Sequence, residues 1–171
     1  ESLFPNLESW YLSFKKLSSE NAKPKFPKIA SFKGKLALDT STFKDALLEI
    51  LATGRELSRL HTYAHLRHDE DITNDAFKVA YVRICSLLHD FSEETAWFEP
   101  EILAMDENKL DKIINSNELQ PYKFALEKIV RIKKHTLNEE QEAILALAGK
   151  PLETAHKTFS ALNDADFKFP N

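Results

Sequence analysis

Residues 61–73, HTYAHLRHDEDIT, contain the junction between the two longest runs of helical sequence in the chain. Apolar residues recur at helical spacing on both sides of the junction, over about residues 41–68 and residues 74–98. The junction itself is short and polar, which is typical of a turn between two neighbouring helices. The sequence therefore predicts two long antiparallel helices over these two ranges, at the centre of the fold. Apolar residues cover a wide arc of the second helix, so we expect it to be buried.

The rest of the chain also favours helices. Only three glycines occur in 171 residues, so there are few tight turns, and this argues against a fold of many strands. Further helical patterns begin at Asn6 and near Pro100, and others cover about residues 106–114, 118–132, 139–148 and 151–162. We therefore expect an all-α fold of about eight helices in orthogonal or bundle-like packing, as a single domain over residues 1–171.

Composition and charge narrow the possible partners. The formal net charge is −4 and no basic block occurs, so we expect no nucleic-acid binding. No run of 18 apolar residues occurs, so we expect no membrane partner. A lone cysteine, Cys85, allows no disulfide within the chain, and we expect it to be a small buried side chain. The first residue, Glu1, is not methionine, and the last residues resemble the start of another element, so we expect a fragment of a longer protein.

The histidines of the opening stretch have part of the pattern of a zinc site. His61 and His65 are four residues apart, which is the histidine spacing of the zinc-peptidase motif HExxH. That chemistry needs a glutamate after the first histidine, to take a proton from zinc-bound water. Thr62 stands there instead, and HExxH occurs nowhere in the chain. The zinc-peptidase motif is therefore absent from residues 1–171.

Helical phase indicates a packing role for the three histidines. His61 and His68 project close to the apolar face of the first long helix, and His65 lies at its edge, so we expect partly buried packing with hydrogen bonds. Two alternatives stay open: a metal ion held by two histidines and an acid from a neighbouring element, and a pH-sensing or substrate-contacting role.

The three acids Asp69, Glu70 and Asp71 are expected just beyond the helix end, because carboxylates are unfavourable at a helix C-terminus. There they would serve the turn and the cap of the next helix. An ion pair that anchors this turn to another part of the molecule is the alternative.

Several stretches in this order resemble the N-terminal region of the oligoendopeptidase F family of zinc metallopeptidases. They are SFKGKLA (31–37), LSRLHTYAHLRHDEDITN (57–74), FEPEILAM (98–105), KHTLNEEQEAILALAG (134–149) and FSALNDADFKFPN (159–171).

The resemblance implies a cytoplasmic zinc metalloendopeptidase several times longer than this chain, which hydrolyses short oligopeptides in an enclosed channel. Its HExxH motif and its zinc would lie outside residues 1–171, in a C-terminal catalytic domain, so the resemblance implies no catalytic and no metal-binding residue within residues 1–171. This segment would be a non-catalytic lobe that walls or gates substrate access. Its partners would be that catalytic domain and short peptide substrates.

The resemblance also places the C-terminal end of the chain in the vicinity of the substrate cleft. The residues concerned are Asn163, Asp164, Asp166 and Phe167. The alternative to a peptidase lobe is a stand-alone helical interaction or scaffold domain without catalysis.

Overall fold

The computed structural model describes residues 3–17 and 23–132, together with positions 141, 144, 148, 154, 155, 158 and 159. The chain divides into two compact units, Glu1–Arg131 and Ile132–Asn171. The helices predicted over 139–148 and 151–162 lie outside the described residues, apart from those single positions, each of which is helical. The expectation of one domain over residues 1–171 stays a prediction.

Every element of the first unit that the structure describes is helical, which confirms the all-α class. In chain order the elements are α1 (Leu7–Leu17), α2 (Pro27–Ala30), α3 (Thr40–Glu70), α4 (Asp75–Thr95), α5 (Phe98–Leu103), α6 (Glu107–Ile114), the 3₁₀ helix η1 (Asn117–Tyr122) and α7 (Lys123–Ile132). None of the described helices is both long enough and apolar enough to cross a membrane.

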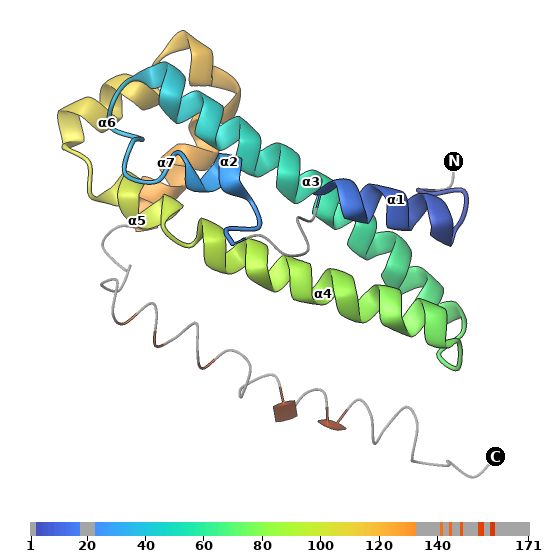
Figure 1. Cartoon of the computed structure of the whole chain (residues 1–171). Coiled ribbons are helices and arrows are strands. Elements are labelled where there is room, and N and C mark those ends of the chain that lie inside the picture. The colour runs from blue at the N-terminus through green and yellow to red at the C-terminus, as the bar shows by residue number, and fades with distance from the viewer. Residues whose placement is uncertain are drawn as a thin grey trace. The chain divides into compact units, whose positions relative to one another are not determined.

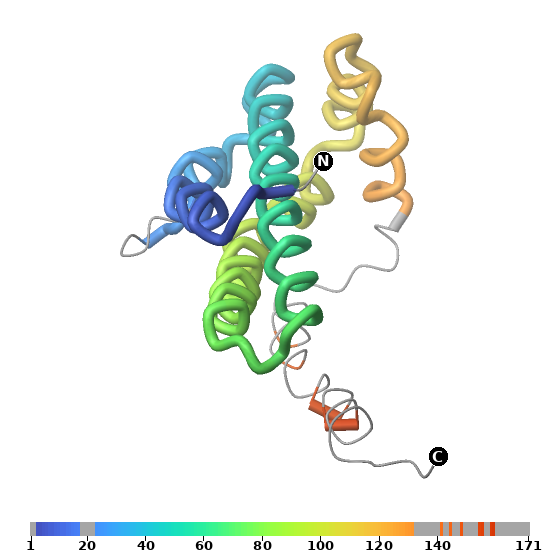
Figure 2. The backbone as a smooth tube through the Cα atoms, turned by 90° about the vertical axis from the view of Figure 1, so that its right-hand side faces the viewer, coloured from blue at the N-terminus to red at the C-terminus, as the bar shows by residue number. Residues whose placement is uncertain are grey.

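The predicted central hairpin is formed by α3 and α4, which lie side by side and run in opposite directions (Figures 1 and 2). The Asp39 carboxylate accepts the backbone N–H of Thr42 at 2.7 Å and begins α3. The Asn74 side chain accepts the N–H of Ala76 at 3.0 Å and begins α4. Both are N-cap bonds, which satisfy backbone donors that a helix start leaves unpaired.

The predicted ends of the hairpin helices need two corrections. Helix α3 continues to Glu70, so Asp69 and Glu70 lie inside its last turn rather than beyond it. The side chain of Arg67, one turn earlier, donates to Glu70 at 2.6 Å, and this offsets the unfavourable position of the carboxylate. Helix α4 ends at Thr95 rather than near residue 98, because Pro100 has no N–H for the carbonyl of residue 96 and its ring would clash there.

Two apolar clusters form the interior of the first unit, and α3 contributes to both. The first lies around the α3–α4 hairpin and includes Trp10, Phe14, Leu57, Leu60, Ile84 and Leu87. The second lies around the start of α3 and includes Phe43, Ala46, Phe98, Ile102, Leu110 and Leu119. Ile50 of α3 packs against both clusters. Helix α3 therefore ties the two halves of this core together.

Helix α4 is less buried than its apolar sequence predicted. Ala80, Ile84 and Leu87 are buried, but Val79 is 45% exposed and Val82 is 60% exposed. The prediction of an apolar helix buried over a wide arc is wrong for this outer face.

Position 54 of α3, occupied by Gly54, has room for a small side chain beside α4. A methyl group there would lie 3.7 Å from the ring of Phe91, which is ordinary van der Waals contact. The close approach of a neighbour therefore does not require glycine at this position of α3.

Two carboxylates hold the segment before α3 against the helices that follow α3. Glu94 of α4 accepts the backbone N–H of Lys25 at 2.7 Å and that of Phe26 at 2.9 Å. Glu101 of α5 accepts the N–H of Gly34 at 2.8 Å and that of Leu36 at 2.9 Å. Each carboxylate thus pairs two backbone donors that belong to no helix ladder.

Candidate functional site: the histidine and tyrosine cluster

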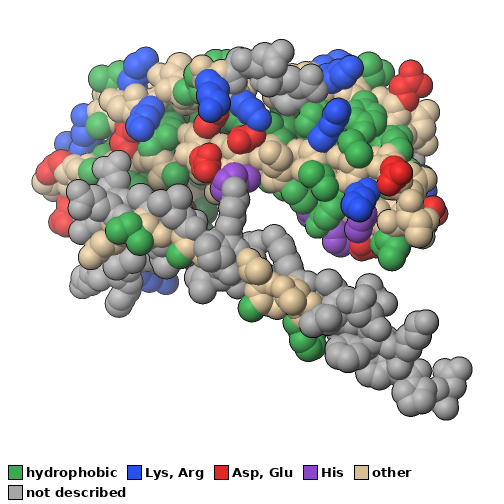
Figure 3. Space-filling model, turned by 60° about the horizontal axis from the view of Figure 1, so that its bottom comes forward, with side chains coloured by type: hydrophobic (Ala, Val, Ile, Leu, Met, Phe, Trp, Pro, Cys, Tyr) green, Lys and Arg blue, Asp and Glu red, His purple; other side chains and the backbone are tan. Residues whose placement is uncertain are grey.

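The three histidines of the opening stretch surround one side chain of the opposite helix, Tyr81 of α4. The ring centroid of Tyr81 lies 5.7 Å from that of His61, 5.4 Å from that of His65 and 5.0 Å from that of His68. The rings of His61 and His65 also stack on each other, with centroids 5.6 Å apart. Figure 3 shows histidine side chains gathered at one end of the face it draws, beside hydrophobic ones. We define the histidine–tyrosine cluster as His61, His65, His68 and Tyr81.

The carboxylate of Asp69 borders this cluster. Its Oδ2 lies 3.4 Å from Nδ1 of His65, one helical turn earlier, and its Oδ1 lies 3.6 Å from Nδ1 of His68. One carboxylate therefore faces two imidazoles.

Asp71 has a separate role in the turn between the two helices. Its Oδ1 accepts the N–H of Thr73 at 3.0 Å and the hydroxyl of Thr73 at 2.6 Å. These bonds lower the pKa of Asp71 below 3.8, since they favour its charged form.

Burial makes His61 the electrostatically distinct member of the cluster. Desolvation lowers the pKa of His61 below 6.5, and the nearby imidazole of His65 lowers it further. The pKa of Tyr81 is raised above 10.0, by burial first and then by the Cys85 thiol and the charge of Asp69. Cys85 itself is only partly buried, where the sequence suggested full burial.

The cluster does not have the arrangement of a metal centre. Among the residues that the structure describes, no group of three histidine, cysteine, aspartate or glutamate side chains could hold a metal ion. The rings of His61 and His65 stack instead of converging on one point. The hydroxyl of Thr62, at the position of the missing glutamate, donates to the carbonyl of Ser58 at 2.9 Å. These residues therefore do not fit the zinc ion of a zinc-peptidase motif.

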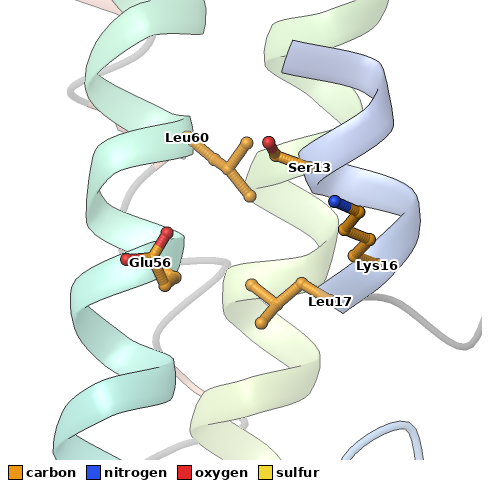
Figure 4. A pocket seen from close by; sticks show the side chains of 5 residues that line it. All are labelled: Ser13, Lys16, Leu17, Glu56 and Leu60. Carbon is orange, nitrogen blue, oxygen red and sulfur yellow. The ribbon is translucent and has the colours of Figure 1, made fainter. Parts of the chain in front are cut away.

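A small cavity lies away from the histidines, between α1 and α3. It measures about 190 Å³ and is lined by Ser13, Lys16, Leu17, Glu56 and Leu60. Figure 4 shows Lys16 on α1 and Glu56 on α3 on opposite sides of it. Typical sites for small-molecule ligands have volumes of roughly 300–1,000 Å³. The cavity is therefore too small for a drug-sized ligand or a peptide.

The structure does not test the residues that were predicted to lie near a substrate cleft. Asn163, Asp164, Asp166 and Phe167, which the sequence placed near a substrate cleft, lie outside the described residues.

Sequence reasoning missed Tyr81, the residue on which the histidines converge. Its place in the apolar run of the second predicted helix was a signal that it lies on the hairpin interface. The connection between the two helices sets their register, that is, which turn of one helix faces which turn of the other. The helical period of the sequence does not specify this register.

Comparisons with known proteins show what the chain is similar to. The family model described as Oligopeptidase F matches residues 101–169. The chain is 36% identical to Oligopeptidase PepF of Bacillus subtilis, over 100% of this chain and 25% of that protein. It is 39% identical to an Oligoendopeptidase F homolog of Borreliella burgdorferi, over 79% of this chain and 23% of that protein.

A solved structure gives the same relationship. The oligoendopeptidase-F from Enterococcus faecium superimposes with a TM-score of 0.74 and 30% sequence identity, over 95% of this chain and 30% of that one. The chain thus spans about a quarter of the length of the curated relatives that it matches.

Proposed function

Because this chain is homologous to about a quarter of the length of the oligoendopeptidase F peptidases, we propose that it is a non-catalytic helical lobe of a peptidase that hydrolyses short oligopeptides. The observation that carries this proposal is the alignment with the Bacillus relative, which runs the whole length of the chain at 36% identity. The lobe would pack against a catalytic domain in the same parent protein and would wall or gate the access of substrate.

The catalytic step would use residues outside residues 1–171. We propose that the parent is a zinc-dependent metalloendopeptidase, in which zinc would supply an activated water for hydrolysis. This chain contains no HExxH, and the hydroxyl of Thr62 is bonded to helix backbone. In this proposal no residue of the lobe takes part in peptide-bond hydrolysis. A single cysteine without a disulfide partner in the chain is compatible with action in the cytoplasm.

The lobe would contribute steric selection. The two hairpin helices, of 31 and 21 residues, pack on each other through the buried side chains of the first cluster and would form a rigid wall at neutral pH. A rigid wall beside an active site admits an extended short peptide and excludes a folded protein. Movement of such a lobe would gate the entry of substrate.

Exposed apolar side chains offer a test between a lobe and a stand-alone module. Leu66, Ile72, Val79, Val82 and Phe124 of the first unit are between 45% and 74% exposed. Where such side chains form one contiguous patch, the patch is typical of a face that packs on another part of a protein. We therefore expect the isolated chain to bind a hydrophobic dye. The alternative, a self-contained interaction or scaffold domain, predicts no such binding.

A chimera tests the proposed function directly. The segment of Bacillus subtilis Oligopeptidase PepF that aligns with this chain would be replaced by residues 1–171, and the cleavage of quenched fluorescent peptides would be measured. We expect the chimera to cleave short peptides and to leave a folded protein intact, and we expect the isolated chain to cleave neither.

Two outcomes would contradict this expectation. Cleavage by the isolated chain would place the chemistry inside residues 1–171. A folded chimera without activity, beside an active parent enzyme, would show that this chain cannot serve as the lobe. A chimera that cleaves short peptides and also degrades the folded protein would leave the lobe assignment intact and remove the gating role.

A further inference from the structure

The three histidines of the histidine–tyrosine cluster differ in their charged neighbours. His65 and His68 each face the carboxylate of Asp69, at 3.4 Å and 3.6 Å. For His61, no ion pair with a carboxylate is found in residues 3–17 and 23–132. Its neighbours are the ring of His65, at 5.6 Å, and that of Tyr81, at 5.7 Å.

His61 also lies at the interface between the two long helices. Its own helix contributes the ring of His65, and α4 contributes the ring of Tyr81. The next groups outward are His68 and the Cys85 thiol, which lie against Tyr81, and Asp69, which faces His65. A proton added to His61 would thus place a positive charge in a partly buried aromatic environment, one helical turn from another imidazole. Burial without a counter-charge disfavours a charged group.

We propose that the α3–α4 hairpin is a pH-responsive element in which protonation of His61 weakens the packing of α3 on α4. Near neutral pH, the uncharged His61 ring packs against Tyr81 and His65. In mild acid, the charged His61 ring has no carboxylate partner among the described residues, and it is better solvated when the end of the hairpin opens. His65 and His68 each have the carboxylate of Asp69 within 3.6 Å, whereas no such partner of His61 is found among the described residues, so the response depends on His61.

The direction of the pH effect follows from the lowered pKa of His61. The folded protein binds this proton less readily than the unfolded chain, whose histidine has a pKa near 6.5. The free energy of unfolding therefore falls as the pH drops through 6.5 toward the folded-state pKa, and the stabilising contribution is fully present above 6.5. Asp39 and Asp71 do not interfere, because their pKa values are lowered below 3.8.

Urea unfolding of the full 171-residue chain at about pH 7.5 and about pH 5.5, on either side of the histidine pKa, tests this response. We expect the urea midpoint of the native chain to fall between the two pH values, and His61→Gln to retain less than about half of that fall. Glutamine is polar and helix-compatible and does not titrate. The matched control is His89→Gln on α4, where the histidine lies 2.9 Å from Glu93, and it should retain the full fall.

A second measurement keeps the test decisive if His61→Gln does not fold. NMR titration of the native chain should give His61 a pKa below 6.5, and His65→Gln should raise it. A His61 pKa at or above 6.5, or the same midpoint fall in His61→Gln and the native chain, would overturn the proposed response. None of these measurements depends on peptidase activity, so the pH response and the proposed function can fail separately.

Discussion

The two tryptophans show how a buried indole depends on its hydrogen-bond partner. Trp10 is fully buried, and its Nε1–H donates to the carbonyl of Leu60 at 2.8 Å, which joins α1 to α3. Trp97 also buries its Nε1, but no partner for that atom is found among the described residues. A buried donor without a partner carries a desolvation cost, whereas a paired donor contributes to stability. The two indoles should therefore respond differently to the loss of the N–H.

We expect Trp10→Phe to lower the free energy of unfolding by about 1–2 kcal/mol, from the lost hydrogen bond and the reduced packing. Trp97→Phe should change it by no more than about 0.5 kcal/mol, because removal of an unpaired N–H offsets the lost packing. Urea unfolding followed by far-UV circular dichroism measures both. Equal losses in the two variants would show that volume, and not the hydrogen bond, sets the cost.

At the scale of elements, the chain before α3 is fixed by side chains from α4 and α5. Residues 31–37 contain Gly34, whose φ of +77° lies in the left-handed region that favours glycine. Glu101 accepts backbone N–H groups on both sides of this turn, from Gly34 and Leu36. An irregular segment is thereby attached to a helix that begins more than 60 residues later in the sequence.

Replacement of Glu101 by glutamine should loosen this attachment. Glutamine presents one carbonyl oxygen and an NH₂ group where two N–H donors converge, so one charge-assisted bond is lost. We expect Glu101→Gln to lower the free energy of unfolding by about 1–3 kcal/mol, measured by urea unfolding. The exposed Glu99 of the same helix supplies the control, since Glu99→Gln should have little effect. Similar losses from both variants would point to the helix dipole instead of the turn.

At the scale of the first unit, α3 links two apolar clusters that involve different parts of the chain. Leu57 and Leu60 lie in the first cluster, and Phe43 and Ala46 lie in the second. Packing in both clusters stabilises this one helix of 31 residues. If one cluster unfolded, α3 would lose part of the packing that keeps it helical, and the other cluster would be destabilised. The two clusters should therefore unfold together.

We expect Ile84→Ala in the first cluster and Ile102→Ala in the second each to cost about 2–5 kcal/mol, because both side chains are fully buried. Each variant should shift one common transition, seen alike by tryptophan fluorescence and circular dichroism. Val82→Ala, at a position 60% exposed, should shift it little. Two separate transitions, each moved by only one of the variants, would contradict the coupling through α3.

Much of the fold could be predicted from the local sequence. The spacing of apolar residues predicted the two long helices, and the capping role of Asp39 and Asn74 follows from residue type. The ends of these helices were harder to predict. The ion pair of Arg67 with Glu70 outweighs the dipole rule at the end of α3, and Pro100 ends α4 before the apolar run does. The outer face of α4 was misjudged, since periodicity reports which residues share a face and not whether a neighbour covers it.

The sequence by itself determined the helical class, the hairpin and the absence of an HExxH motif, since each depends on residues that are close together in the chain. The tertiary structure alone decided that three histidines surround Tyr81, that Glu94 and Glu101 hold the segment before α3, and that α3 joins two clusters. These features pair residues far apart in the sequence. The packing of one helix on another sets such pairs, and helical periodicity does not specify it.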